Sequence, residues 1–153
     1  MFDPAEDGIT HINIYSKSQS DLGRLLSNFA FTPFKHPRHG KFNSIEGYWF
    51  WLQSKPSFQR ESLRILTGAP AKSLGQKLLA EYKQGDPEFR SDIAEAISCK
   101  TYQHYKIYKA LKETALPFTH YYVYGNRKVD AGFTWLVDLW EERRRIIHNE
   151  ERG

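Results

Sequence analysis

The order of apolar and polar positions predicts short extended segments near both ends of the chain. Residues 1–10 show no regular pattern and are expected to be a loose lead-in. Polar and apolar side chains alternate over 11–15, and strand-forming aromatics dominate 120–124, so both segments are predicted to be strands. Residues 21–26 have the pattern of a short helical turn, and the prolines and glycine within 33–42 favour a loop or hairpin.

Most of the remaining chain has the pattern of helices. Prolines as first helical residues, Ser44 and Asp86 as caps, and apolar positions three to four residues apart carry this prediction. The helices are predicted at residues 45–53, 57–66, 70–83, 87–113 and 132–148. The fold class is therefore α+β, a predominantly helical single domain with a few short strands, occupying residues 11–148 after the lead-in.

The predicted helix 70–83 carries an apolar stripe with one glycine inside it. Its inner face is expected to consist of Leu74, Leu78, Leu79 and Tyr82. Gly75 costs about 1 kcal/mol relative to alanine in a helix interior. A close approach of another backbone or of a ligand would explain that glycine, as would chance.

Composition narrows the class of protein. The chain has 153 residues, 40% of them hydrophobic and 26% charged, which is typical of a folded globular domain and excludes a disordered chain. No apolar run approaches the roughly 18 residues that a membrane span requires. A single cysteine, Cys99, cannot form an internal disulfide. Together these features favour a cytoplasmic protein without a membrane partner.

The formal net charge of +4 is modest, and its most concentrated part is the arginine run 143–145. Such a run can attract a nucleotide or nucleic acid. Glu141 and Glu142 precede it and two further glutamates follow at 150 and 151, so a solvated helix face is the preferred interpretation. Nucleic-acid binding through these arginines is the least favoured function.

Glu46 is the carboxylate best placed to be a catalytic residue. It follows the capping residue Ser44 and is close in sequence to Tyr48, Trp49 and Trp51. Aromatic shielding would raise its pKa and suit it to acid–base work, whereas the helix N-terminus would keep it ionised and able to stabilise positive charge. From the residues alone, a simple first-turn carboxylate that stabilises its helix is the better interpretation.

Other polar residues give weaker signals. The Asn28 amide can exchange hydrogen bonds with ribose hydroxyls beside Phe29, although an asparagine turn is the commoner role. His36 and His39 have no acidic or cysteine partner near in sequence, so a metal site is not expected. The sequence contains no glycine-rich phosphate loop, and no cofactor is expected.

Taken in order, several motifs resemble the NADAR family, also called YbiA-like proteins. The two most specific are LSNF at residues 26–29 and SIEGYW at residues 44–49, in the order and spacing of the family. Weaker matches lie at Pro33-Phe34, Gly40, AKSLG at 71–75 and KTYQ at 100–103.

The resemblance implies chemistry at the N-glycosidic bond of a ribosyl group. The ligand would be a ribosylated small molecule or an ADP-ribosylated nucleobase, free or within nucleic acid. Glu46 would be the catalytic carboxylate, with Asp130 as the nearest acid late in the chain. The resemblance also implies that Asn28 and Phe29 shape the ribosyl site. The hypothesis of ribosyl hydrolysis adds further candidate substrate-binding residues, namely Arg24, Ser27, Ser44, Trp49, Lys55, Lys72 and Tyr124.

The chain departs from the family pattern at two places. The histidine that usually follows the glutamate is Gly47. In the late D-x-x-W-G element, Tyr121 stands at the aspartate position and Tyr124 at the tryptophan position. A catalytically weak or inactive module that binds ADP-ribose or a nucleotide is therefore the alternative function.

Overall fold

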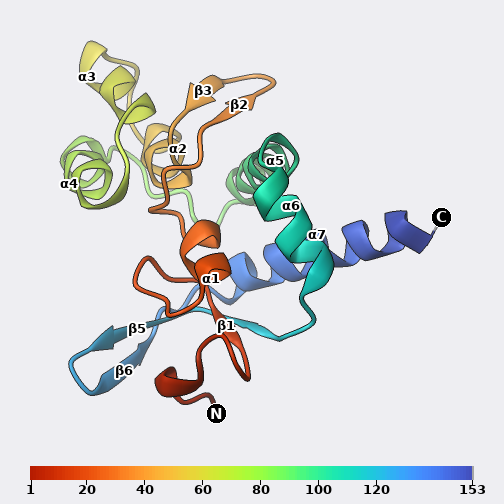
Figure 1. The fold of residues 1–153 in the computed structure, drawn as a ribbon. Helices are drawn as coiled ribbons and strands as arrows, with labels where there is room; N and C mark the ends of the chain where they lie inside the picture. The colour runs from red at the N-terminus through yellow and green to blue at the C-terminus, as the bar shows by residue number, and fades with distance from the viewer. Residues whose placement is uncertain (153) are drawn as a thin grey trace. The chain divides into compact units, whose positions relative to one another are not determined.

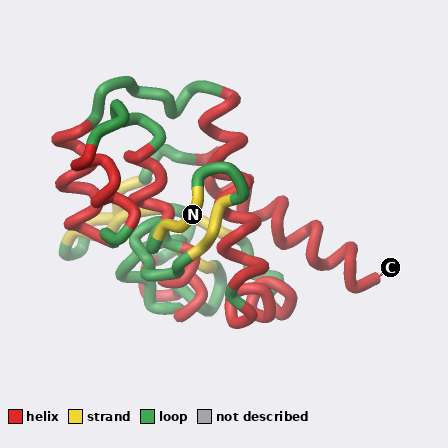
Figure 2. Tube along the Cα trace, turned by 90° about the horizontal axis from the view of Figure 1, so that it is seen from above, coloured by secondary structure: helices red, strands yellow, loops and turns green. Residues whose placement is uncertain are grey.

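The computed structural model describes residues 1–152, with side chains described through residue 150. Two compact units form: unit 1 contains residues 1–27 and the chain from residue 105 onward, and unit 2 contains residues 28–104 (Figure 1). Helix predominates and the strands are short, so the predicted α+β class is confirmed (Figure 2). Among residues 1–152, no helix has the length and apolar character needed to cross a membrane.

Unit 1 combines helices with two small sheets. Strand β1 pairs in parallel with β4, and β5 pairs antiparallel with β6 in a hairpin that turns at Gly125, where φ is +62° (Figure 1). The elements of unit 1 are η1 (Pro4–Glu6), β1 (Ile12–Asn13), α1 (Asp21–Leu26), α6 (Tyr105–Glu113), β4 (Phe118–Thr119), β5 (Tyr121–Tyr124), β6 (Arg127–Asp130) and α7 (Thr134–Arg152).

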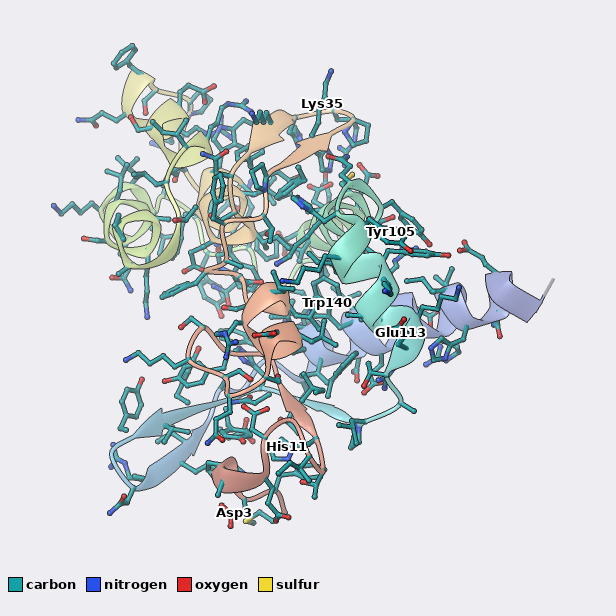
Figure 3. The ribbon with its side chains drawn as sticks, in the orientation of Figure 1. Asp3, His11, Lys35, Tyr105, Glu113 and Trp140 are labelled. Carbon is teal, nitrogen blue, oxygen red and sulfur yellow. The ribbon has the colours of Figure 1, made fainter. Side chains whose placement is uncertain are left out.

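The core of unit 1 lies between α6 and its neighbours α1 and α7. Leu26, Ile107, Leu111 and Trp140 are completely buried there. Figure 3 labels Trp140, together with the residues at the two ends of α6. Next to this core, the Asn13 side chain donates to the Tyr121 carbonyl and accepts from the Tyr121 N–H, both at 2.9 Å. This amide joins β1 to β5.

The first ten residues are ordered, so the prediction of a loose lead-in is wrong. Asp7 is buried, and its carboxylate accepts hydrogen bonds from Asn13 N, Ser18 Oγ and Gln19 N at 2.7–3.0 Å. These contacts tie the start of the chain to the segment that leads into α1. The last predicted helix, 132–148, ends too early, because α7 continues to Arg152.

Unit 2 is built around one short aromatic helix. Its elements are β2 (Phe34–His36), β3 (Gly40–Phe42), α2 (Ile45–Trp51), α3 (Phe58–Glu61), η2 (Ser62–Arg64), α4 (Gly68–Leu78) and α5 (Pro87–Gln103). The predicted hairpin is confirmed, with Phe34 opposite Phe42. The rings of Phe34 and Phe42 lie 6.0 and 4.8 Å from that of Tyr48, so the hairpin and α2 share one core.

Two predicted helices were too long. The segment 87–113 divides at His104, whose backbone is extended and whose ring Nε2 lies 2.5 Å from the Pro33 carbonyl oxygen. Helix α4 ends at Leu78, since the N–H groups of residues 80 and 81 donate to the Gln53 carbonyl instead of continuing the helix. Leu79 and Tyr82 are 41% and 69% exposed, so their predicted place in a core stripe is wrong.

Gly75 is required by packing. A Cβ at this position would lie 2.1 Å from the Phe50 ring, so α4 and α2 meet at a distance that only glycine permits. We expect Gly75→Ala to lower the free energy of unfolding by about 1–3 kcal/mol through overpacking, although helix propensity alone predicts a gain of about 1 kcal/mol. Urea unfolding would measure the difference.

The matched control is Ser73→Ala, at an exposed position of the same helix. It changes helix propensity without the close contact and should leave stability equal or slightly higher. Equal stabilities of the Gly75 and Ser73 variants would contradict the packing explanation.

Candidate active site

Helix α2, which carries Glu46 in its first turn, begins after the capping residue Ser44. The Ser44 hydroxyl accepts from the Gly47 N–H at 3.1 Å and donates to the Leu66 carbonyl at 2.9 Å. Glu46 therefore occupies the second helical position, and the N–H groups of Glu46 and Gly47 both have hydrogen-bond partners. The predicted cap is confirmed, and the role of Ser44 toward substrate stays a prediction.

The carboxyl of Glu46 lies in surroundings that disfavour its charge. The residue is only 8% exposed. Burial raises its pKa from 4.5 to about 7, and the positive charge of Lys72 on α4 lowers it by a smaller amount. Within residues 1–152, no side-chain or backbone donor is hydrogen-bonded to this carboxyl group. Of the two outcomes predicted for the pKa of Glu46, the raised value is the one found, and burial is its cause.

Asn28 lies directly at the start of α2. Its carbonyl accepts from the Glu46 N–H at 2.9 Å. Its side-chain Oδ1 is buried and has no hydrogen-bond partner among residues 1–152. A buried amide oxygen without a donor is uncommon, so a ligand hydroxyl or N–H is a natural partner for it. The structure thus brings Asn28 and Glu46 together, as the motifs suggested.

Phe29 and Lys72 belong to the same part of unit 2. The Phe29 ring lies 3.9 Å from where a Cβ of Gly68 would be, at the beginning of α4. Lys72, one turn further along α4, is exposed and near enough to influence the charge of Glu46. These four residues, Asn28, Phe29, Glu46 and Lys72, are called the Glu46 site below.

Two other residues predicted for substrate binding occupy different places in unit 2. Trp49 is 5% exposed and packs edge-on against Phe89, with ring centroids 5.0 Å apart. Lys55 is exposed and follows the C-terminal end of α2, whereas Glu46 lies in its first turn. Seven helical residues span about 10 Å, which separates Lys55 from the carboxyl group.

The remaining predicted residues belong to unit 1. Arg24 donates to the Ser18 carbonyl and pairs with Asp21, and Ser27 ends α1 as a buried residue. Tyr124 is 58% exposed at the tip of β5, and Asp130 accepts from the Gly132 N–H at 3.0 Å. Their roles toward substrate stay predictions.

The departures from the family pattern have local structural reasons. A Cβ at Gly47 would lie 2.2 Å from the Leu63 carbonyl oxygen, so the close contact of α2 with η2 excludes a histidine. The Tyr121 hydroxyl lies 2.6 Å from His11 Nε2 in a buried pair, and burial raises its pKa to about 12. Tyr121 therefore has a structural role where the family pattern has an acid.

The sequence prediction gave no role to Lys100. This lysine is completely buried in α5, and burial lowers its pKa to about 7. It follows Ile93, Ala96 and Ile97 at helical spacing within the predicted helix 87–113, and this spacing was a signal for burial. The arginine run also differs from prediction, because Arg144 is 8% exposed, pairs with Glu141 and lies 4.1 Å from the Phe118 ring centroid. A fully solvated face is therefore wrong for Arg144.

The NMR structure of the E. coli protein YbiA is similar to this chain. The TM-score is 0.70 at 22% identity, over 96% of this chain and 94% of YbiA. The fold is YbiA-like. No protein-family model and no curated protein sequence matches the chain. The resemblance in fold is thus confirmed, while membership of the NADAR family stays a prediction carried by the motifs.

Within this YbiA-like fold, the Glu46 site offers acid–base chemistry and polar recognition. It combines one carboxyl group that titrates near neutral pH, one unsatisfied amide oxygen and one lysine. No cluster of three or more metal-ligating side chains occurs in the described part of the chain. The chemistry available here is proton transfer and electrostatic stabilisation of a developing positive charge.

Proposed function

We propose that the chain is a hydrolase that cleaves the C1′–N bond of a ribosyl compound, with Glu46 as the catalytic residue. The observation that carries the proposal is the buried Glu46 carboxyl, which has a pKa of about 7 and no donor bound to it among residues 1–152. An ionisable group whose burial costs free energy of folding, and which has no hydrogen-bond partner, is typical of a functional site. The LSNF and SIEGYW motifs and the YbiA-like fold agree with this assignment.

The reaction makes use of both protonation states of Glu46. Cleavage of the C1′–N bond leaves positive charge on the sugar ring, and the bonding electrons go to the departing nitrogen. The neutral carboxyl can donate a proton to that nitrogen, and the carboxylate that results lies ready to stabilise the oxocarbenium-like sugar. Water then adds to C1′ and releases its proton to the carboxylate, which restores the acid.

Neighbouring side chains would position the substrate. The orphaned Asn28 Oδ1 would accept from a ribose hydroxyl, which supplies the hydrogen bond that this atom lacks. Phe29 would form an apolar wall against the sugar, and Lys72 would meet a phosphate group by charge attraction.

The test is a hydrolysis assay of the purified chain against three substrates: DNA carrying ADP-ribosylated guanine, a phosphoribosylamino-pyrimidine, and NAD. Chromatography would detect the freed base. We expect cleavage of one substrate, lost in Glu46→Gln. Turnover that continues unchanged in Glu46→Gln would overturn the role of this residue.

The alternative is a module that binds ADP-ribose or a nucleotide without turnover. The observation that favours it concerns Tyr121. This residue stands where the family pattern has an aspartate, and its hydroxyl is hydrogen-bonded to His11. Calorimetry would then show ADP-ribose binding, weakened by Asn28→Ala, while mass spectrometry finds all three substrates intact. Binding that Asn28→Ala leaves unchanged would place the ligand elsewhere.

A further inference from the structure

Unit 1 contains a cavity of about 590 Å³ that the Glu46 chemistry does not use. This volume lies in the range of small-molecule sites, roughly 300–1,000 Å³. The cavity lies among the N-terminal segment, the strands β4, β5 and β6, and the beginning of α7. None of the residues of the Glu46 site lines it.

The walls of the cavity are mainly aromatic and apolar. The apolar and aromatic residues that line it are Phe2, Phe118, Tyr121, Phe133 and Val137. The Phe2 ring is held against His11, with ring centroids 4.6 Å apart, and Figure 3 labels His11. Aromatic faces attract cations as well as apolar groups, since each ring carries negative charge density above its plane.

The polar lining of the cavity includes hydrogen-bond acceptors, together with the hydroxyls of Thr119 and Thr134 and the ammonium of Lys128. Asp138 follows Val137 on α7 and also lines the cavity, and no hydrogen bond or ion pair engages its carboxylate among residues 1–152. Asp130 ends β6 and accepts one backbone N–H, from Gly132, through Oδ1. Both residues are exposed, and both carboxylates have capacity to accept further hydrogen bonds.

His120 adds a third acceptor to this lining. Its Nδ1 lies 2.6 Å from the Ile14 carbonyl oxygen, so Nδ1 must carry the proton that this bond requires. Burial lowers the pKa of His120, which keeps Nε2 unprotonated near neutral pH. Its ring is stacked on Phe133, with centroids 6.1 Å apart, and is thus fixed in orientation.

The lining also contains two positive groups, the Lys128 ammonium and the N-terminus at Met1. Lys128 donates to the Phe2 carbonyl at 2.9 Å and lies 4.7 Å from the centroid of the Tyr121 ring. Met1 reaches the lining as a fully exposed residue, where water screens its charge. The groups left for a ligand are the two carboxylates, His120 Nε2 and the buried Thr119 hydroxyl, which has no hydrogen-bond partner among residues 1–152.

We propose that this cavity is a binding site for an organic cation, namely an amine, amidine or guanidine carried on an aromatic or aliphatic body. The cation's N–H groups would donate to Asp138, Asp130 and His120 Nε2, and its body would lie between Phe118 and Phe133. The proposal is independent of the proposed hydrolysis, because its evidence is confined to the lining of this cavity.

Three probes of one shape test the proposal: benzamidine, a cation; benzamide, its neutral counterpart; and benzoate, an anion. Each would be titrated into the full chain and followed by NMR chemical shifts. We expect saturable benzamidine binding with shifts at residues 118–121 and 130–138, at least about tenfold weaker benzamide binding, and no benzoate binding. Equal affinities for benzamidine and benzamide, or no saturable binding of benzamidine, would overturn the proposal.

Matched variants locate the site. Asp138→Asn should weaken benzamidine about tenfold and leave benzamide unchanged, because only the charge is removed. Val137→Trp should fill the cavity and abolish both. Asp86→Asn, which changes an exposed acid of unit 2, is the control and should bind as the parent chain does. If Asp86→Asn weakened benzamidine binding as much as Asp138→Asn does, this result would contradict binding in the cavity.

Discussion

Replacing Glu46 by glutamine is expected to remove hydrolysis and, at the same time, to make the protein more stable at alkaline pH. Loss of a catalytic acid–base group typically lowers turnover by about 10²–10⁴-fold. Glutamine keeps the shape of the side chain and cannot ionise, so the free-energy cost of a buried carboxylate disappears. A residue that merely stabilised its helix through the dipole would give the opposite sign, a loss of stability on neutralisation.

The pH dependence follows from the direction of the pKa shift. Folding raises the pKa of Glu46 from 4.5 to about 7, so between these values the folded protein holds a proton that the unfolded chain releases. The contribution of Glu46 to stability is therefore lost as pH rises from about 4.5 to about 7. The shift corresponds to about 3 kcal/mol. Glu46→Gln should match the parent near pH 4 and exceed it by up to this amount at pH 8.

The chain provides a control at an equivalent helical position. Glu88 is the second residue of α5, as Glu46 is of α2, but it is exposed. Glu88→Gln should leave hydrolysis unchanged and lower stability by about 0.3–1 kcal/mol, the effect of a charge at a helix N-terminus. Urea unfolding of the three proteins at pH 4, 6 and 8 makes the comparison. A destabilised Glu46→Gln at pH 8 would show that burial does not dominate at Glu46.

The sequence predicted those elements whose signals are local. Ser44 caps α2 through its own side chain, Pro87 is the first residue of α5, and the turn at Gly125 joins β5 to β6. Each depends on a few neighbouring residues, which a pattern can capture. The break at His104 depends on Pro33, 71 residues away, and no local pattern contains that contact.

The same distinction holds for the candidate site. Motif spacing indicated Glu46 and Asn28, but the backbone bond that joins them and the orphaned amide oxygen arise only when the segments fold together. The raised pKa of Glu46 is likewise a property of packing around α2. Gly47 shows what the sequence could not predict. A glycine is needed at this position because the Leu63 carbonyl lies close to it, and no feature of α2 itself indicates that contact.

Asp7→Ala is expected to be the most destabilising single change outside the hydrophobic core. The substitution leaves the Asn13 and Gln19 N–H groups and the Ser18 hydroxyl without the carboxylate that they donate to. Buried donors without partners, and the loss of hydrogen bonds to a charged group, together predict a loss of about 3–5 kcal/mol. Urea unfolding measures the loss, and faster hydrogen exchange of the Asn13 and Gln19 amides would locate it.

Asp3 supplies the matched control, because it is an exposed aspartate that accepts one hydrogen bond, from the Ala5 N–H. Asp3→Ala should cost about 1 kcal/mol, the value of a helix cap, and leave exchange at Asn13 and Gln19 unchanged. Because Lys128 donates to the Phe2 carbonyl, release of the N-terminal segment in Asp7→Ala should also open the cavity beside Tyr121 and weaken benzamidine binding. Equal stabilities of the Asp7 and Asp3 variants would mean that the carboxylate of Asp7 does not anchor this segment.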